Sequence, residues 1–126
     1  MFGDPITERM ALETTYEDLA DIERETVTAD EYNIARKVLK PVEVGVICAL
    51  SRGGDQSAQT EAQHNIRHDF KLFLPPETDV KAGDTVKVYR FGRIKEAGEP
   101  LTFEVIGLPL RYLTHTEATV KAVGFA

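Results

Sequence analysis

The sequence predicts a mainly β fold, a small antiparallel β-barrel or sandwich of about six strands. In the second half of the chain, short segments such as KLFLPPETDVKAGDTVKVYR alternate apolar and polar residues, so each strand can bury one face and expose the other. Turns rich in glycine and proline separate these segments, and a small sheet with such turns closes its edges by curling over a core. The 126 residues suffice for one core, so we expect a single domain over residues 1–126.

The composition limits the classes of function. A net charge of −6 repels polyanions and argues against a protein that grips nucleic acid, whereas an acidic wall would let DNA slide past. No apolar run is long enough to cross a bilayer, and the polar start with Asp4 and Glu8 does not match a secretion signal, so we expect no membrane association. The single cysteine, Cys48, lies in an apolar run and is expected to be a buried thiol.

The first 40 residues show the least regular pattern. We expect an N-terminal arm over about residues 1–8 and a first strand over residues 10–16, where Met10, Leu12 and Tyr16 share one parity. Carboxylates crowd the stretch Glu17–Glu31, which favours a solvated excursion over a paired strand. We therefore expect a long acidic insertion over residues 17–40.

A short helix is predicted near residues 29–39, within this insertion. Thr28-Ala-Asp-Glu31 has the spacing of a capping box, in which the hydroxyl and the carboxylate satisfy free amides at a helix start. Pro41 would end that helix.

A clear strand follows from Val42 to Leu50, and its second face is also weakly apolar, which suits a strand covered on both faces or facing a partner subunit. After it comes a long polar loop without large apolar residues, and loops of this length in small domains are uncommon unless they have a function. The loop consists of Ser51, Arg52, Gly53, Gly54, Asp55, Gln56, Ser57, Ala58, Gln59, Thr60, Glu61, Ala62, Gln63, His64 and Asn65.

Three further regions of alternation predict the remaining strands. The first spans Ile66–Leu74 and ends at Pro75-Pro76. Two strands around residues 85–89 and 101–105 are expected to form a hairpin, and a last strand covers residues 117–122.

No constellation of catalytic or metal-binding residues is supported. His64 and His68 have the i, i+4 spacing of a helical metal site, but strand parity from Ile66 onward contradicts a helix there. A Cys48–His115 pair lacks the electropositive surroundings that lower the pKa of a thiol. We therefore expect no enzyme activity, no cofactor and no metal.

The stretch Tyr89–Arg93 interleaves aromatic and basic residues, as single-strand nucleic-acid surfaces do. Strand parity separates Tyr89 and Phe91 from Arg90, and the overall charge is negative, so an aromatic edge facing a protein partner is favoured.

The stretch from Asp79 to Val123 resembles a known family. Asp79-Val80 before a Gly83-Asp84 turn, then Phe103-Glu-Val-Ile-Gly-Leu-Pro109 and a closing strand introduced by His115 and Glu117, are similar to the head-completion proteins of long-tailed bacteriophages. These are the head-to-tail connector proteins known as stoppers. The strand ending in Cys48-Ala-Leu-Ser51 and the polar loop after it also fit this pattern.

The resemblance implies a virion protein with a structural role. Such a protein assembles as a homo-oligomeric ring beneath the portal and its adaptor, seals the channel after genomic DNA has entered, and offers a docking face to the tail terminator or tail tube. The loop Ser51–Asn65 would be the gate of the channel. Alternatives are a tail terminator or connector adaptor of the same virion neck, or a cellular β-barrel that binds a ligand or peptide.

Overall fold

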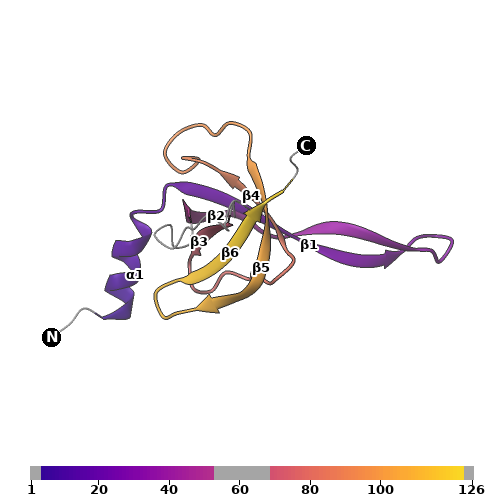
Figure 1. Ribbon diagram of the computed structural model, residues 1–126, viewed down its shortest axis with the longest axis horizontal. Coiled ribbons are helices and arrows are strands. Elements are labelled where there is room, and N and C mark those ends of the chain that lie inside the picture. The colour runs from indigo at the N-terminus through magenta and orange to yellow at the C-terminus, as the bar shows by residue number, and fades with distance from the viewer. Residues whose placement is uncertain (1–3, 53–68, 124–126) are drawn as a thin grey trace, which may run out of the picture.

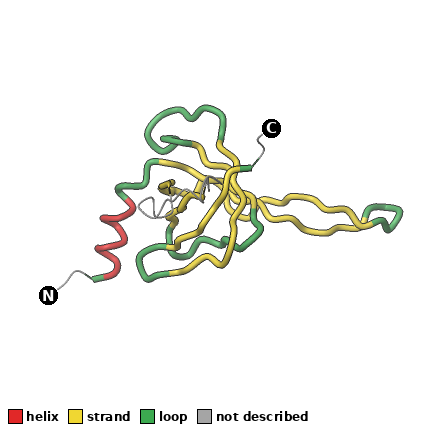
Figure 2. Tube along the Cα trace, viewed as in Figure 1, coloured by secondary structure: helices red, strands yellow, loops and turns green. Residues whose placement is uncertain are grey.

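The computed structural model describes residues 4–52 and 69–123, and it confirms the predicted fold. Six antiparallel strands form a closed barrel in the order β1-β2-β3-β6-β5-β4, with a short helix before the first strand (Figures 1 and 2). The elements are α1 (Pro5–Glu13), β1 (Asp18–Ala29), β2 (Ala35–Arg52), β3 (Asp69–Leu74), β4 (Thr85–Tyr89), β5 (Leu101–Arg111) and β6 (Thr116–Ala122).

Helix α1 stands where we predicted a first strand, so that prediction is wrong, and the predicted arm includes the start of this helix over the described residues 4–8. Asp4 is the N-cap and accepts a 2.8 Å hydrogen bond from the Thr7 amide, while Pro5 occupies the first turn. An N-cap carboxylate followed by proline satisfies the free amides of a helix start. An ion pair between Arg9 and Glu13 adds an i, i+4 contact.

Strands β1 and β2 form a long hairpin, which corrects the predicted excursion and the predicted helix near residues 29–39. Register pairs run from Asp18 opposite Cys48 to Ala29 opposite Ala35. The Asp30 side chain accepts hydrogen bonds from the amides of Tyr32 (2.8 Å) and Ile34 (2.9 Å), and so organises a tight turn at the tip. The chain therefore reverses where a helix was expected to begin.

Strand β2 confirms the predicted strand at Val42–Leu50 and extends it to an earlier start. Extra residues on β2 shift its register against β1 on both sides of Ile22, and Gly45 adopts a φ of +67° there. Such bulges bend a strand and re-aim its side chains. As a result Val42 and Val46 pack against the core while Val44 faces solvent.

The core lies inside the barrel and is built mostly by the later strands, as predicted. Leu72 and Leu74 of β3 are fully buried, and the ring of Phe70 meets that of Phe103 edge-on with centroids 5.3 Å apart. Strands β4 and β5 pair as the expected hairpin. The start of the predicted third strand, including Ile66 and His68, lies outside the described residues. Other core members are Ala20, Ile22, Cys48, Val80, Val86, Val88, Val105, Ala118 and Val120.

Candidate functional site

The most distinctive surface is the distal half of the β1–β2 hairpin, from Arg24 to Lys40. Strand β1 pairs with β4 only as far as Glu23, and β2 pairs with β3 only from Ala49 onward. Beyond those points the hairpin leaves the barrel and projects as a two-stranded ribbon, to the right in Figure 1. Neither outer edge of the ribbon pairs with another strand within the described residues. The ribbon is therefore available for contacts outside the subunit.

Apolar side chains are exposed along this ribbon. Tyr32 at the tip is 76% exposed, and Val27, Ile34 and Leu39 are each more than half exposed. These exposed apolar side chains are distributed along a projecting arm, and exposed apolar side chains of this kind are typical of sites that bind another protein.

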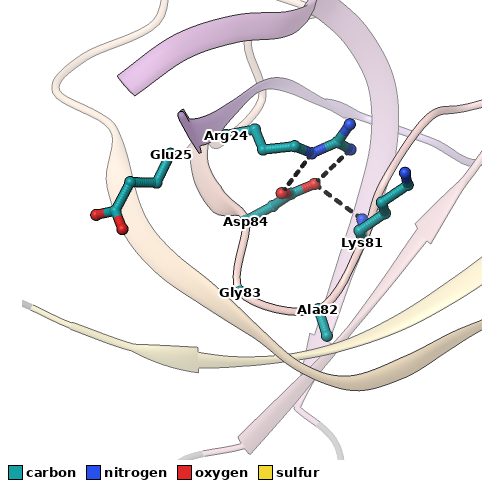
Figure 3. A pocket seen from close by; sticks show the side chains of 6 residues that line it. All are labelled: Arg24, Glu25, Lys81, Ala82, Gly83 and Asp84. Carbon is teal, nitrogen blue, oxygen red and sulfur yellow. Dashed lines mark hydrogen bonds and ion pairs between the residues drawn. The ribbon is translucent and has the colours of Figure 1, made fainter. Parts of the chain in front are cut away.

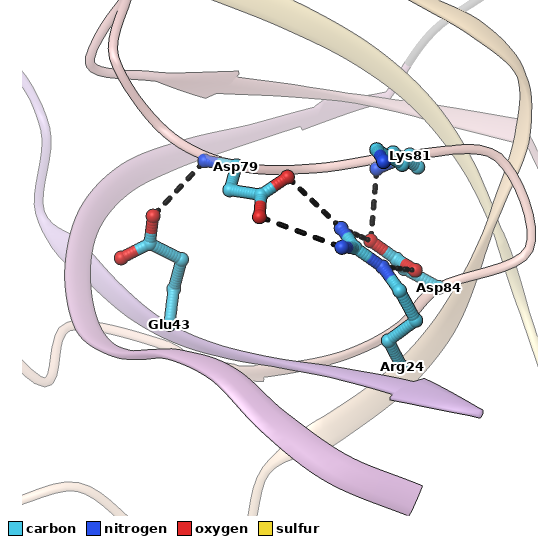
Figure 4. Close-up of polar contacts among 5 residues, drawn as sticks. All are labelled: Arg24, Glu43, Asp79, Lys81 and Asp84. Atoms are coloured by element: carbon cyan, nitrogen blue, oxygen red, sulfur yellow. Dashed lines mark hydrogen bonds and ion pairs between the residues drawn. The ribbon is translucent and has the colours of Figure 1, made fainter. Parts of the chain in front are cut away.

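A buried ion pair fixes the root of the hairpin to the barrel. The Arg24 guanidinium of β1 donates to both carboxylate oxygens of Asp84, at 2.9 Å from Nε and 2.9 Å from Nη2 (Figure 4). Asp84 is almost fully buried and also accepts the Lys81 amide at 2.8 Å. A bidentate pair of this kind sets orientation as well as adding energy.

Asp79 ties both strands of the hairpin to the same segment. Its carboxylate accepts from Arg24 Nη2 at 3.0 Å, and its backbone amide donates to the Glu43 carboxylate of β2 at 2.9 Å (Figure 4). The hydrogen bond from Arg24 lowers the pKa of Asp79 below its ordinary value, and the two carboxylates raise the pKa of Arg24. The connection between β3 and β4 thus determines the direction of the ribbon.

A shallow recess of about 260 Å³ lies beside this anchor (Figure 3). Its lining residues are Arg24, Glu25, Lys81, Ala82, Gly83 and Asp84. The guanidinium that dominates the recess already donates to two carboxylates of its own chain through Nε, Nη1 and Nη2, so an anion would have to compete with these carboxylates. The recess is best explained as part of the anchor.

A second buried carboxylate, Asp18, joins the start of β1 to the residues that follow β4. Asp18 accepts from the Phe91 amide at 2.8 Å and from Arg90 Nε at 3.3 Å. Arg90 and Lys95 both lie over the Phe91 ring, at 4.9 and 5.5 Å from its centroid. The aromatic and basic residues of this stretch therefore contact one another, and the predicted partner-facing edge at Tyr89 stays a prediction.

Another exposed apolar surface lies at the end of β5 and in the turn to β6, which Figure 1 shows away from the hairpin tip. Leu108 and Leu113 are 82% and 79% exposed. Tyr112 stacks on His115 with ring centroids 4.8 Å apart, and His115 Nε2 lies 2.9 Å from the Glu117 carboxylate. Apolar side chains are thus exposed here as well as along the ribbon.

The structure describes some of the residues predicted for a gate or for a catalytic site, and others lie outside the described residues. Ser51 and Arg52 are the last residues of β2 and pair with β3, whereas Gly53–Asn65, with His64, lies outside the described residues, as does His68. Cys48 is buried as predicted, and burial raises the pKa of its thiol. The partners of His115 are Thr114 and Glu117.

The described residues offer neither a metal site nor a membrane-spanning helix. Residues 4–52 and 69–123 contain no group of three or more histidine, cysteine or acidic side chains placed to hold a metal ion. Over the same part of the chain, no helix has the length and apolar character needed to span a bilayer.

A solved structure of low sequence identity shares this fold. The solution structure of protein SF1141 from Shigella flexneri 2a aligns with a TM-score of 0.63 at 14% identity, over 85% of this chain and 92% of that chain. The structure of protein xkdH of the phage-like element PBSX from Bacillus subtilis aligns with a TM-score of 0.46 at 17% identity, over 86% of this chain and 96% of that chain. No protein-family model matches the chain. No curated protein matches it either.

Proposed function

We propose that this protein is a ring-forming structural component of the head–tail connector of a tailed bacteriophage, a stopper that seals the DNA channel and provides the tail attachment surface. The observation that carries the proposal is the ribbon Arg24–Lys40, which leaves a closed barrel and exposes apolar side chains and strand edges to other molecules. An arm of this kind suits a protein whose role is to contact other proteins.

The placement of the resembling segment also supports this role. Gly83 adopts a φ of +89° and the adjacent Asp84 is the buried anchor of the ribbon. The segment Phe103–Pro109 lies in β5, and its end belongs to the second exposed apolar surface. The residues that resemble the stopper family thus include the anchor of the ribbon and part of the second exposed apolar surface.

The charge of the chain is compatible with passage of DNA. A net charge of −6 disfavours adhesion of phosphate groups, and DNA that must leave through a channel should not bind its wall. In this proposal the ring contacts a portal or adaptor on one side and a tail terminator or tail tube on the other, and the protein resides in the virion.

Purified protein added to tailless, DNA-filled phage heads tests the proposal. We expect it to bind the heads, to prevent DNA release measured by nuclease sensitivity, and to allow tails to join. Binding to tail tubes in preference to heads would instead favour a tail terminator. A protein that binds neither heads nor tails contradicts the proposed function.

The resemblance adds a test of the gate. Deleting Gln56–Glu61 should leave the thermal unfolding of the isolated protein cooperative and its binding to heads intact, while the completed heads leak DNA. Heads that retain DNA as well with the deletion as without it would show that this segment does not close the channel.

A further inference from the structure

The two outer edges of the ribbon differ in charge. Beyond its pairing with β4, from Arg24 to Ala29, β1 carries one acidic residue, Glu25, and one basic residue, Arg24, which is already paired with Asp84 and Asp79. From Ala35 to Pro41 the β2 side carries three basic residues and no acidic one. One edge is therefore acidic and the other is basic.

The backbone along both edges is available for hydrogen bonding. At the tip the Asp30 amide donates to the Ile34 carbonyl at 3.1 Å, and pairs in an antiparallel ladder alternate between bonded and non-bonded from that point. Thr28 and Arg36 therefore bond within the hairpin, and their neighbours direct their amides and carbonyls outward. The outward-facing residues are Glu25, Val27 and Ala29 on β1 and Ala35, Lys37 and Leu39 on β2.

The charges favour pairing of unlike edges over pairing of like edges. Pairing of two β2 edges would place lysine opposite lysine or arginine. Pairing of two β1 edges would place carboxylates opposite each other. Both arrangements are unfavourable, because like charges opposite each other across a strand pair are destabilising. A β2 edge against a β1 edge brings Lys37 within reach of a Glu25 from another subunit. Within the hairpin the same two residues already approach to 3.8 Å between Lys37 Nζ and Glu25 Oε1.

Pairing of unlike edges has a definite symmetry. When β2 of one subunit runs antiparallel to β1 of the next, both hairpins point in the same direction and their barrels lie side by side. Such a contact is heterologous, because it joins two different surfaces, and a heterologous contact that closes makes a ring. Pairing of like edges would instead give a two-fold dimer.

We propose that the β2 edge of one subunit pairs antiparallel with the β1 edge of a second copy of this chain, so that the ribbons of a ring form one continuous cylindrical sheet. Such pairing deepens the proposed function, on which it rests, by naming the surface that closes the ring. Pro41, which lacks an amide, ends the pairing toward the barrel.

Two charge-reversed variants test this pairing. Glu25→Lys has lysine at both positions and Lys37→Glu has glutamate at both, so neither can form a Glu–Lys pair between these positions, within or between subunits. In an equimolar mixture each unlike-edge contact between the two variants has one lysine and one glutamate. A carbodiimide, which joins carboxylates to amines in contact, can then link positions 25 and 37 only between chains.

We expect the mixture to give crosslinked oligomers about tenfold more abundant than either variant alone, with the 25–37 linkage identified by mass spectrometry. Glu104→Lys mixed with Lys121→Glu is the matched control, because these residues pair inside the barrel wall between β5 and β6. The control mixture should give no linkage between chains at positions 104 and 121.

Each result has a definite meaning. Absence of the 25–37 linkage in the mixture overturns the edge pairing. If the unmodified protein still completes heads in that case, the proposed function stands. The linkage in a protein that fails to bind heads would support the edge pairing while contradicting the stopper function.

Discussion

Replacing Arg24 with methionine tests whether the buried ion pair fixes the ribbon to the barrel. The change keeps a long apolar side chain and removes the guanidinium. Asp84 then remains a buried carboxylate that has lost both hydrogen bonds from Arg24. It still accepts the hydrogen bond from the Lys81 amide, at 2.8 Å. An uncompensated buried charge is strongly destabilising, so we expect a lower free energy of unfolding.

The structure sets the size of the effect. Removing one partner of a buried pair costs about 3–5 kcal/mol, but the Arg24 side chain is 26% exposed, so water can partly replace it. Its second partner, Asp79, is half exposed and adds little. We therefore expect a loss of about 2–3 kcal/mol, which for a chain of this length lowers Tm by about 10 °C.

Urea unfolding followed by circular dichroism at neutral pH measures this loss. The control is Arg36→Met, because Arg36 pairs with Asp30 at 3.0 Å on the exposed tip of the same ribbon. That pair should contribute no more than about 0.5 kcal/mol. Equal losses in the two variants would refute the anchoring role of Arg24, since burial would then make no difference.

Three further measurements follow from the described geometry. The pKa of Asp79 is lowered by Arg24, so the stability it contributes is present above the ordinary carboxyl pKa of about 4 and is lost as pH falls through the lowered value; NMR titration should show this shift, and Arg24→Met should abolish it. Gly45→Ala should cost about 1 kcal/mol because of its positive φ, whereas Gly98→Ala, equally open to a Cβ and without a positive φ, should be neutral in urea unfolding. Cys48 should react with a disulfide reagent at pH 8 only after unfolding, because burial raises its pKa; fast reaction of the native protein would contradict its burial.

The later strands could be predicted because their residues alternate between the core and solvent. In β4, β5 and β6 one face meets the core and the other meets water, so alternation in the sequence matches alternation in burial. The paired strands β4 and β5 and the turn at Gly83 follow from the same pattern.

The ribbon could not be predicted from alternation, because both of its faces are largely exposed and neither needs to be apolar. Its carboxylates therefore suggested a solvated insertion. The β-branched run Thr26-Val27-Thr28 and the turn residues Asp30 and Asn33, the latter at a φ of 64°, were the signals that favour a hairpin.

Helix α1 was missed for a different reason. Over residues 10–16 a few apolar residues matched a period of two, and this match predicted a strand. Asp4-Pro5 at the start of the helix is the signal that could have found it. The anchor of Arg24 with Asp84 and Asp79 was beyond sequence reasoning, because it joins residues far apart in the chain.

Because the ribbon is attached to the barrel only at its root, the length of the ribbon can change without a change in the barrel. Arg24 and Glu43 hold the root, and no residue from Glu25 to Pro41 belongs to the core or packs against it. Two residues inserted in each strand would lengthen the arm by about 7 Å and keep every side chain on its original side. Insertions and deletions can therefore change the span of the arm in discrete steps, while the barrel that carries it remains the same.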